Sequence, residues 1–573
     1  MTPGPAFRPT FVPVPTGSEA ASFDAAARDA GTPGAVLMES AGRAAADVAH
    51  AVAGQGTGPG TGPGTGAGAG RPVVVFAGAG NNGGDAVVLA RTLHARGREV
   101  LLLVDPRRPA PDALLHGHRV PTATLPSGSP SAEKGETEVR IRELVGARAP
   151  ALLVDGLLGT GLHEEPREPV AGWIRGLNAL GTRTPVLALD LPSGVVADSG
   201  RAPGAVVRAD FTVAFGAPKL GSLLHPGREH AGRIVAVEIG FPPWQASDAS
   251  ALLVTGAWAH ATLPRRSRNT HKNAVGRLLL VCGGEDGGGA AVLAARAALR
   301  AGVGMLRVLC SPRHRDLFHH HVPEAILPDP THADAVRNAV ENSDAVAAGP
   351  GMGLDPEGFP VRLLPGIMEQ LAESAERVLL LDADALTLLG RGSLPPLPRG
   401  DADRCLLTPH PGELARILGE EAVPELAPQA ARRAAERWGA TCLLKGAPSV
   451  VATPGDAPVR ISASGGSAFA RGGMGDVLTG VAGALLARGL PAAGAAALAL
   501  HLTGRAADRF MHRAPADRAS GDALLPSDLV DELPGVLAEV ERDDAPDAGA
   551  PPPGEGPDLS GVMGLFLDLG ASR

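Results

Sequence analysis

Cysteine is scarce in this sequence of 573 residues. Its four cysteines lie far apart, each in or beside an apolar run: Cys282, Cys310, Cys405 and Cys442. Neither the paired spacing of a zinc site nor the cysteine density of a disulfide framework is present. We therefore expect reduced, buried thiols, as in a cytoplasmic protein.

Long apolar runs and an excess of positive charge are also lacking. No uninterrupted apolar run reaches 18 residues, because Arg488 and Pro491 interrupt the best candidate. No basic segment followed by an apolar one opens the sequence. The formal net charge of −9 argues against a general nucleic-acid or membrane-surface protein. We expect a cytoplasmic protein that binds neither nucleic acid nor membrane.

Lysine is rare as well. Only four of the 52 basic residues are lysines: Lys134, Lys219, Lys272 and Lys445. Where arginine is the default cation, each lysine marks a position that favours a compact ammonium group. Three of the four fall inside the motifs described below.

What the chain does contain is a repeated alternation of short apolar strands and amphipathic helices, the pattern of parallel α/β sheets. We predict strands at 73–77, 100–104, 151–155, 186–190, 211–215 and 234–239, then at 278–282, 306–310, 345–348, 378–382, 405–408 and 442–445. The predicted domains span 17–243, with a low-complexity insert at 54–70, and 262–541. We expect a long loop at 106–135 and a disordered tail at 542–573, in which the apolar piece 562–570 has no evident role.

A glycine-rich loop, ARGGMGDVLTG at 470–480, leads into a predicted helix. Gly472, Gly473 and Gly475 let backbone amides crowd together, and with the positive end of the helix they form an anion site. Asp476 in this loop could simply cap the helix. The rest of the chain favours a second reading, in which Asp476 moves a proton on a substrate beside a bound phosphate.

The first half carries a second glycine loop, GAGNNGGD at 78–85, whose G-x-G-x-x-G spacing is a weak signal alone. Asn82, Asp155 and Ser193 follow three predicted strands, with Asp85 and Asp190 nearby. The carboxyl ends of parallel strands share one sheet edge, so these side chains should converge. Their oxygens suit a hard cation, monovalent or divalent. The alternative is that they cap helices or fill turns.

The motifs GAGNNGGD (78–85), VDGLLGTGL (154–162), LDLPSG (189–194) and ADFTVAFGAPKLG (209–221) resemble, in that order, those of NAD(P)H-hydrate epimerases. The resemblance implies a Rossmann-like domain that inverts C6 of the hydrates NADHX and NADPHX, with potassium held by Asn82, Asp155 and Ser193. It makes Asp190 the acid/base. The substrate-binding residues it implies are Asn81, Asn82, Gly83, Gly84, Asp85, Gly159, Thr160, Gly161, Leu162, His163, Glu164, Glu165 and Asp190. Ala86 departs from the family's usual glycine.

The second half resembles the ribokinase-like NAD(P)H-hydrate dehydratases in motifs at 268–284, 289–304, 348–353, 381–386, 407–414, 443–451 and 470–480. The resemblance implies removal of water from the S hydrate at the expense of ADP, with Mg²⁺, giving AMP and phosphate. Asp476 would be catalytic, and the hydrate would contact Ala290, Gly353, His410 and Asp476. The nucleotide would contact Lys445, Gly446, Ala447, Pro448, Ser449 and Gly475. The chain departs from the family's pattern in two places. The loop at 283–290 is one residue shorter than the family's usual loop, and Gly466 replaces the family's usual asparagine.

Together the motifs predict an isomerase fused to a lyase that repairs nicotinamide nucleotides. A small-molecule kinase of the same fold and a non-catalytic hydrate-binding protein are the alternatives. The fused first domain argues against the kinase, and intact Asp85, Asp190 and Asp476 argue against the binding protein. The residues leave ADP and ATP open. We expect NADHX, NADPHX and ADP as small-molecule partners, and a homo-oligomer.

A run of three histidines, His319, His320 and His321, invites a metal-site interpretation. Consecutive histidines cannot all point one way, and no carboxylate follows at ligand spacing. We therefore favour a surface helix or loop there.

Overall fold

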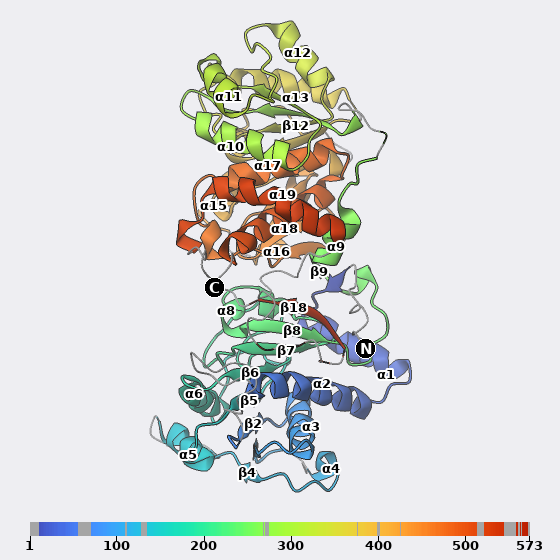
Figure 1. Ribbon diagram of the computed structural model, residues 1–573, viewed down its shortest axis with the longest axis vertical. Coiled ribbons are helices and arrows are strands. Elements are labelled where there is room, and N and C mark those ends of the chain that lie inside the picture. Colours follow the sequence, from blue (N-terminus) through green and yellow to red (C-terminus); the bar gives the residue numbers. More distant parts are fainter. Residues whose placement is uncertain are drawn as a thin grey trace. The chain divides into compact units, whose positions relative to one another are not determined.

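The structure is a computed structural model and describes residues 11–54, 70–108, 112–127, 135–267, 269, 274–374, 376–397, 402–423, 426–512, 521–543, 557, 559, 562 and 564–570. Most of the insert at 54–70, the acidic part of the tail, Lys134 and Lys272 lie outside these residues. The chain divides into two compact units, residues 1–251 with 550–573, and residues 252–549 (Figure 1).

The first unit is built on a sheet with the strand order β18-β8-β7-β6-β5-β2-β3-β4. All neighbours from β8 to β4 are parallel. The strands are β2 (Val73–Ala77), β3 (Val100–Val104), β4 (Thr122–Thr124), β5 (Leu152–Gly156), β6 (Val186–Leu189), β7 (Phe211–Phe215), β8 (Arg233–Val237) and β18 (Leu565–Leu569). The six strands predicted for this half are all present, so its α/β fold is confirmed.

Helices cover both faces of this sheet because alternate strand residues point to opposite sides. Val73, Val75 and Ala77 pack with α2 (Gly34–Gly54) and α3 (Asn81–Ala95). Val74 and Phe76 pack in a second core with α5 (Glu136–Val145) and α6 (Val170–Gly181). The remaining helices of the unit are α1 (Gly17–Asp29), α4 (Asp112–Leu115), α7 (Leu220–Leu223) and α8 (Gly227–Ala231).

Two predicted irregular segments contain regular structure. The segment 106–135 includes α4 and β4, so the prediction of one long loop is corrected. The predicted disordered tail includes β18, which pairs antiparallel with β8. In Figure 1 the dark red β18 lies beside the green β8. Arg233 Nε donates to Asp568 Oδ1 at 2.8 Å, and Leu567 and Leu569 are buried. These contacts explain why the apolar piece 562–570 is ordered over Leu565–Leu569.

In the second unit the sheet runs β9-β17-β16-β15-β14-β13-β12-β10-β11. Its six predicted strands are present as β10 (Arg277–Val281), β11 (Met305–Leu309), β12 (Ala345–Ala348), β13 (Val378–Leu381), β14 (Cys405–Leu407) and β15 (Thr441–Leu444), all in parallel pairs. The sequence analysis missed the antiparallel extension by β16 (Ser449–Ala452) and β17 (Val459–Ser462), and β9 (Ala251–Leu253) at its end. The α/β fold of this half is also confirmed.

One face of this sheet packs against α10 (Gly288–Arg300), α17 (Met474–Ala487) and α18 (Ala492–Met511), and α19 (Pro526–Arg542) packs on α10 and α18 in the same core. The other helices are α9 (Gly256–Thr262), α11 (Arg315–His321), α12 (Ala333–Glu341), α13 (Leu364–Ala372), α14 (Ala383–Gly390), α15 (Pro411–Leu418) and α16 (Ala427–Trp438). All four cysteines are free and buried, as predicted. Within the described ranges, no helix combines the length and the apolar character needed to cross a membrane.

Candidate active sites

The three proposed cation ligands of the first unit converge at the carboxyl ends of β2, β5 and β6. Ser193 Oγ donates to Asp155 Oδ1 at 2.7 Å, and the Ser193 amide donates to Asp155 Oδ2 at 2.8 Å. Asn82, in the first turn of α3, donates through Nδ2 to the carbonyls of Leu158 and Leu189, at 2.7 and 3.1 Å. The Leu158 amide in turn donates to Ser193 Oγ at 2.8 Å.

This cluster has the features of a small cation site. The buried Asn82 Oδ1 has no hydrogen-bond partner among the residues that the structure describes, which is costly unless a positive group meets it. Burial raises the pKa of Asp155 to about 6, although hydrogen bonds from Ser193 and Leu157 lower it. A cation beside these oxygens would offset both costs, and an all-oxygen shell suits a hard ion.

Two glycines close the loop around this cluster. A Cβ at Gly83 would lie 1.9 Å from the Gly78 carbonyl oxygen, and one at Gly78 would lie 1.9 Å from the Leu157 carbonyl oxygen. No side chain fits at either position. The methyl group of Ala86, where the family has glycine, is buried against β5, and Gly156 leaves the room for it.

Asp190 lies directly after β6 with a left-handed backbone, φ 65°. Its Oδ1 accepts a hydrogen bond from Lys219 Nζ. Burial, then Asp190 and Asp24, raise the pKa of Asp85 well above its usual value. Burial and then Asp190 raise the pKa of Asp24, which lies on α1. The sequence analysis missed Asp24 and Lys219, although Lys219 lies within the motif 209–221 and is one of the four lysines.

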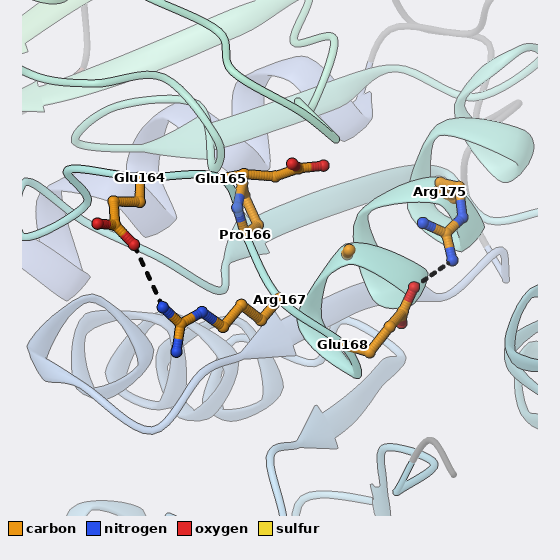
Figure 2. A pocket seen from close by; sticks show the side chains of 7 residues that line it. Glu164, Glu165, Pro166, Arg167, Glu168 and Arg175 are labelled. Atoms are coloured by element: carbon orange, nitrogen blue, oxygen red, sulfur yellow. Dashed lines mark hydrogen bonds and ion pairs between the residues drawn. The ribbon is translucent and has the colours of Figure 1, made fainter. Parts of the chain in front are cut away.

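The proposed substrate contacts in the loop after β5 lie in two places, beside Asn82 and at an exposed cavity. Gly159 lies next to Asn82, since a Cβ there would be 3.4 Å from Asn82 Cβ. His163, Glu164 and Glu165 are exposed. Glu164 and Glu165 line a cavity of about 510 Å³ with Pro166, Arg167, Glu168, Ala171 and Arg175. In Figure 2, Glu164 faces Arg167 and Glu168 faces Arg175, ion pairs of 3.2 and 2.7 Å. This lining includes neither Asp190 nor the three cation ligands.

In the second unit, charged groups gather at the strand ends beneath the glycine loop. Lys445 Nζ lies 2.7 Å from Asp382 Oδ1 and 3.6 Å from Glu413 Oε2. A Cβ at Gly475 would lie 3.5 Å from Lys445 Nζ, so the ammonium group lies close to the N-terminus of α17. Asp382 also accepts hydrogen bonds from Thr408 Oγ1 at 2.8 Å and Thr479 Oγ1 at 2.6 Å.

These contacts set the proton affinity of Asp476, which lies in the first turn of α17. Burial and then the charge of Asp382 raise the pKa of Asp476 to about 7, although Lys445 lowers it. Burial alone would raise the pKa of Asp382, but Lys445 and the threonine hydroxyls lower it. For Lys445, burial lowers the pKa and the carboxylates of Asp382 and Glu413 raise it by more. Asp476 is therefore suited to exchange a proton near neutral pH.

The remaining predicted residues surround this cluster. His410 caps α15, and its Nδ1 accepts from the amides of Gly412 and Glu413 at 3.0 and 3.3 Å. The neutral ring therefore carries its proton on Nε2, and its side chain is 53% exposed. The Gly353 amide donates to Asp384 Oδ2 at 2.8 Å. Ala290 lies in the first turn of α10.

Of the six predicted nucleotide contacts, Gly475 lies in the first turn of α17 and the other five lie between β15 and the start of β16: Lys445, Gly446, Ala447, Pro448 and Ser449. Within this segment, the Gly446 amide donates to Ser449 Oγ at 3.2 Å. The short loop 283–290 touches the loop 348–353, because a Cβ at Gly287 would lie 1.9 Å from the Gly351 carbonyl oxygen. The sequence analysis missed Asp382 and Glu413, although the motifs 381–386 and 407–414 contain them.

The three consecutive histidines lie exposed at the end of α11. Among the residues that the structure describes, no three His, Cys, Asp or Glu side chains gather as a metal site.

The fold and the two clusters define an α/β enzyme with a separate reaction centre in each unit. Residues 34–221 match the family model described as YjeF-related protein N-terminus, and residues 278–534 match that described as NAD(P)H-hydrate dehydratase. The chain belongs to the family of bifunctional NAD(P)H-hydrate repair enzymes, as its motifs predicted.

Individual members of the family are similar in sequence to this chain over most of its length. It is 35% identical over 535 residues to the bifunctional NAD(P)H-hydrate repair enzyme Nnr of Salinibacter ruber, covering 89% of this chain and 93% of that one. It is 35% identical over 470 residues to the Escherichia coli Nnr, covering 81% and 84%. Among solved structures, an ADP/ATP-dependent NAD(P)H-hydrate dehydratase from Bacillus subtilis, co-crystallised with ATP/Mg²⁺, is 30% identical. That match covers 50% of this chain and 98% of that one, with a TM-score of 0.41.

Proposed function

We propose that the protein repairs hydrated nicotinamide nucleotides in two reactions. The first unit interconverts the R and S epimers of NADHX and NADPHX. The second unit dehydrates the S epimer to NADH or NADPH and converts ADP to AMP and phosphate. The observation that carries the proposal is Asp476, with its pKa raised to about 7, beside a glycine loop and the ammonium group of Lys445. Family membership supports both reactions.

The second unit's residues fit a phosphoryl-transfer dehydration. Asp476 takes the proton from the C6 hydroxyl as the hydroxyl oxygen bonds to the β-phosphorus of ADP and AMP leaves. Phosphate then leaves C6 with the electrons of the C–O bond and takes up the proton released from C5, so that the C5–C6 double bond forms. Amides at Gly472–Gly475 and the Lys445 ammonium stabilise the negative charge on the transferred phosphate. His410 offers its Nε2 proton as a further donor. Mg²⁺ is proposed to enter with the nucleotide.

The first unit's residues fit an acid/base epimerisation. Inverting a hydroxyl-bearing carbon beside a ring nitrogen needs a group that exchanges a proton with that hydroxyl in both directions. We assign that exchange to Asp190. Asn82, Asp155 and Ser193 would hold potassium, which supplies a fixed positive charge that orders the hydrate. The loops 81–85 and 159–165 provide the substrate contacts.

One incubation tests the proposal against a kinase. Mixed R and S hydrates are supplied with ADP, and in parallel with ATP, while absorbance at 340 nm reports reduced nucleotide. We expect a nucleotide-dependent rise that continues until both epimers are consumed. Consumption of nucleotide with a phosphorylated product and no rise at 340 nm would favour a small-molecule kinase.

The cytoplasmic location and the homo-oligomeric state stay predictions. Cell fractionation tests the cytoplasmic location, and light scattering of the purified protein tests the homo-oligomeric state.

A further inference from the structure

Lys219 is a buried ammonium group beside the proposed acid/base of the first unit. It precedes α7, and its side chain is only 5% exposed. Its Nζ donates to the Phe215 carbonyl at 2.9 Å, the Ala217 carbonyl at 3.2 Å and Asp190 Oδ1. An ammonium group has three protons, and each of these has an acceptor. Lys219 therefore has no donor left for a substrate.

The hydrogen bonds that the Asp190 carboxylate accepts both fall on one of its two oxygens. Its Oδ1 accepts from both Lys219 Nζ and the Phe215 amide, the latter at 3.2 Å. Its own amide donates to the Val213 carbonyl at 2.7 Å, and its backbone is left-handed with φ 65°. Among the described residues no donor reaches Oδ2, and the side chain is 16% exposed. Oδ2 is thus the oxygen that remains for proton exchange.

The Lys219 ammonium group also offsets the negative charge of neighbouring carboxylates. Asp24 on α1 and Asp85 on α3 both interact electrostatically with Asp190 and with Lys219. Arg108 also acts on Asp85. Without Lys219, three carboxyl groups from different elements would share the site with no ammonium group among them. Neighbouring like charges oppose ionisation, and their repulsion pushes carboxylates apart.

We propose that Lys219 is a positioning residue for the epimerase reaction. It anchors Asp190 Oδ1 inside the protein, so that Oδ2 meets the C6 hydroxyl of the hydrate. Oδ2 accepts the hydroxyl proton as the C6–N1 bond breaks, its electron pair going to N1 and C6 becoming an aldehyde carbon. The proton returns to the oxygen when N1 re-forms the bond on the opposite face of C6, and Lys219 itself transfers no proton. This inference rests on the proposed epimerase function and adds a residue that acts through Asp190.

A double-mutant cycle separates positioning from a merely structural role. Epimerisation of pure R hydrate is followed by chromatographic separation of the epimers, with no nucleotide present. For Lys219→Met we expect kcat to fall by about 10²-fold, the scale of a misplaced catalytic group, with KM within about threefold. The double variant Lys219→Met, Asp190→Asn should be no slower than Asp190→Asn alone.

Several results would overturn the inference. Independent, multiplying losses in the double variant would show that Lys219 does not act through Asp190. A raised KM at unchanged kcat would make Lys219 a substrate-binding group. Lys219→Met within threefold of the wild type would leave it without a role in the reaction. If the wild type itself does not epimerise R hydrate, the proposed function fails, which is a distinguishable outcome.

A control for effects on folding is Ser222, which lies in α7, the helix that follows Lys219. Ser222 Oγ donates to the Lys219 carbonyl at 2.7 Å and is not among the described donors to Asp190. Ser222→Ala should therefore epimerise at the wild-type rate. Lys219→Gln keeps an N–H donor for the buried carbonyls while removing the charge, and it should show the same loss of kcat. Circular dichroism and melting curves accompany each variant. If both Lys219 variants unfold and Ser222→Ala does not, Lys219 serves folding and the inference falls.

Discussion

At the scale of single residues, Asp476 carries the proposed dehydration. Asp476→Asn should abolish ADP-dependent formation of NADH while nucleotide binding stays nearly intact, because the carboxylate lies beside the amides of the glycine loop. Loss of a general base typically costs about 10²–10⁴-fold in rate. Stopped-flow absorbance at 340 nm measures the rate, and calorimetry with ADP measures the binding. A variant within threefold of the wild type would contradict the assignment.

The pH dependence follows from the same carboxylate. With its pKa raised to about 7, Asp476 is protonated below that pH and cannot accept the hydroxyl proton. The kcat/KM of dehydration should therefore rise through about pH 7 and fall below it. Asp382 is a cause of the raised pKa, so Asp382→Asn should move this limb to lower pH. A limb that moves to higher pH would contradict the electrostatic argument.

Lys445 distinguishes the two subsites of the second unit. Lys445→Ala removes the cation nearest Gly475 and leaves Asp382 with only its threonine donors. The KM for ADP should rise more than the KM for the S hydrate, because we assign the Lys445 ammonium group to the phosphate of the nucleotide. Initial rates with each substrate varied in turn measure both constants. An effect on the hydrate alone would show that the two subsites are exchanged.

Asp155 tests the proposed potassium site. Asp155→Ala removes the one formal charge among the three ligands, and the remaining neutral oxygens should hold a monovalent ion poorly. The variant should lose R-hydrate conversion and still dehydrate S hydrate at the wild-type rate. From mixed epimers, recovery of NADH or NADPH should stop near the S fraction, apart from the uncatalysed interconversion of the epimers. Equal loss on S hydrate would contradict independent sites, and circular dichroism would exclude unfolding as its cause.

At the scale of elements, the turn from β2 into α3 depends on glycine. Gly83→Ala would place a Cβ 1.9 Å from the Gly78 carbonyl oxygen, so the loop must shift away from Asn82 and Asp155. Epimerase activity should be lost while S-hydrate dehydration stays intact. Gly80→Ala in the same loop is the matched control, since its Cβ meets nothing within 4 Å. Equal behaviour of the two variants would contradict the steric argument.

The sequence predicted the elements better than their side-chain partners. Apolar periodicity placed the twelve predicted strands, and strand ends brought Asn82, Asp155 and Ser193 together, because parallel strands order such residues along one edge. The pairing of Lys445 with Asp382 and of Lys219 with Asp190 was missed. Lys219 and Asp190 follow the neighbouring strands β7 and β6, whereas Lys445 and Asp382 follow β15 and β13, which β14 separates. Both pairs depend on side-chain conformations that no periodicity encodes. The hairpin of β16 and β17 was missed because no helix lies between its strands, whereas the predicted strands alternate with helices.

At the scale of the whole molecule, the chain forms the first unit, then the second, and returns to the first with its last residues. A sequence pattern cannot show this return, because β18 pairs with β8 across more than 300 residues. The contacts are specific. Leu559, Val562, Leu567 and Leu569 are buried, and Asp568 pairs with Arg233. The first unit is therefore completed only by the C-terminal segment.

A chain ended after residue 549 tests this dependence. It loses the buried leucines of β18, worth about 1.5–3 kcal/mol each, a substantial part of the 5–15 kcal/mol that holds a domain folded. It also exposes β8 as an open edge, which favours aggregation. Calorimetry should show the first unit's transition at a lower temperature, with epimerase activity reduced and S-hydrate dehydration retained. Asp568→Asn, which keeps the strand and loses only the ion pair, should show a smaller shift. Unchanged melting and epimerase activity in the shortened chain would contradict a stabilising role for β18.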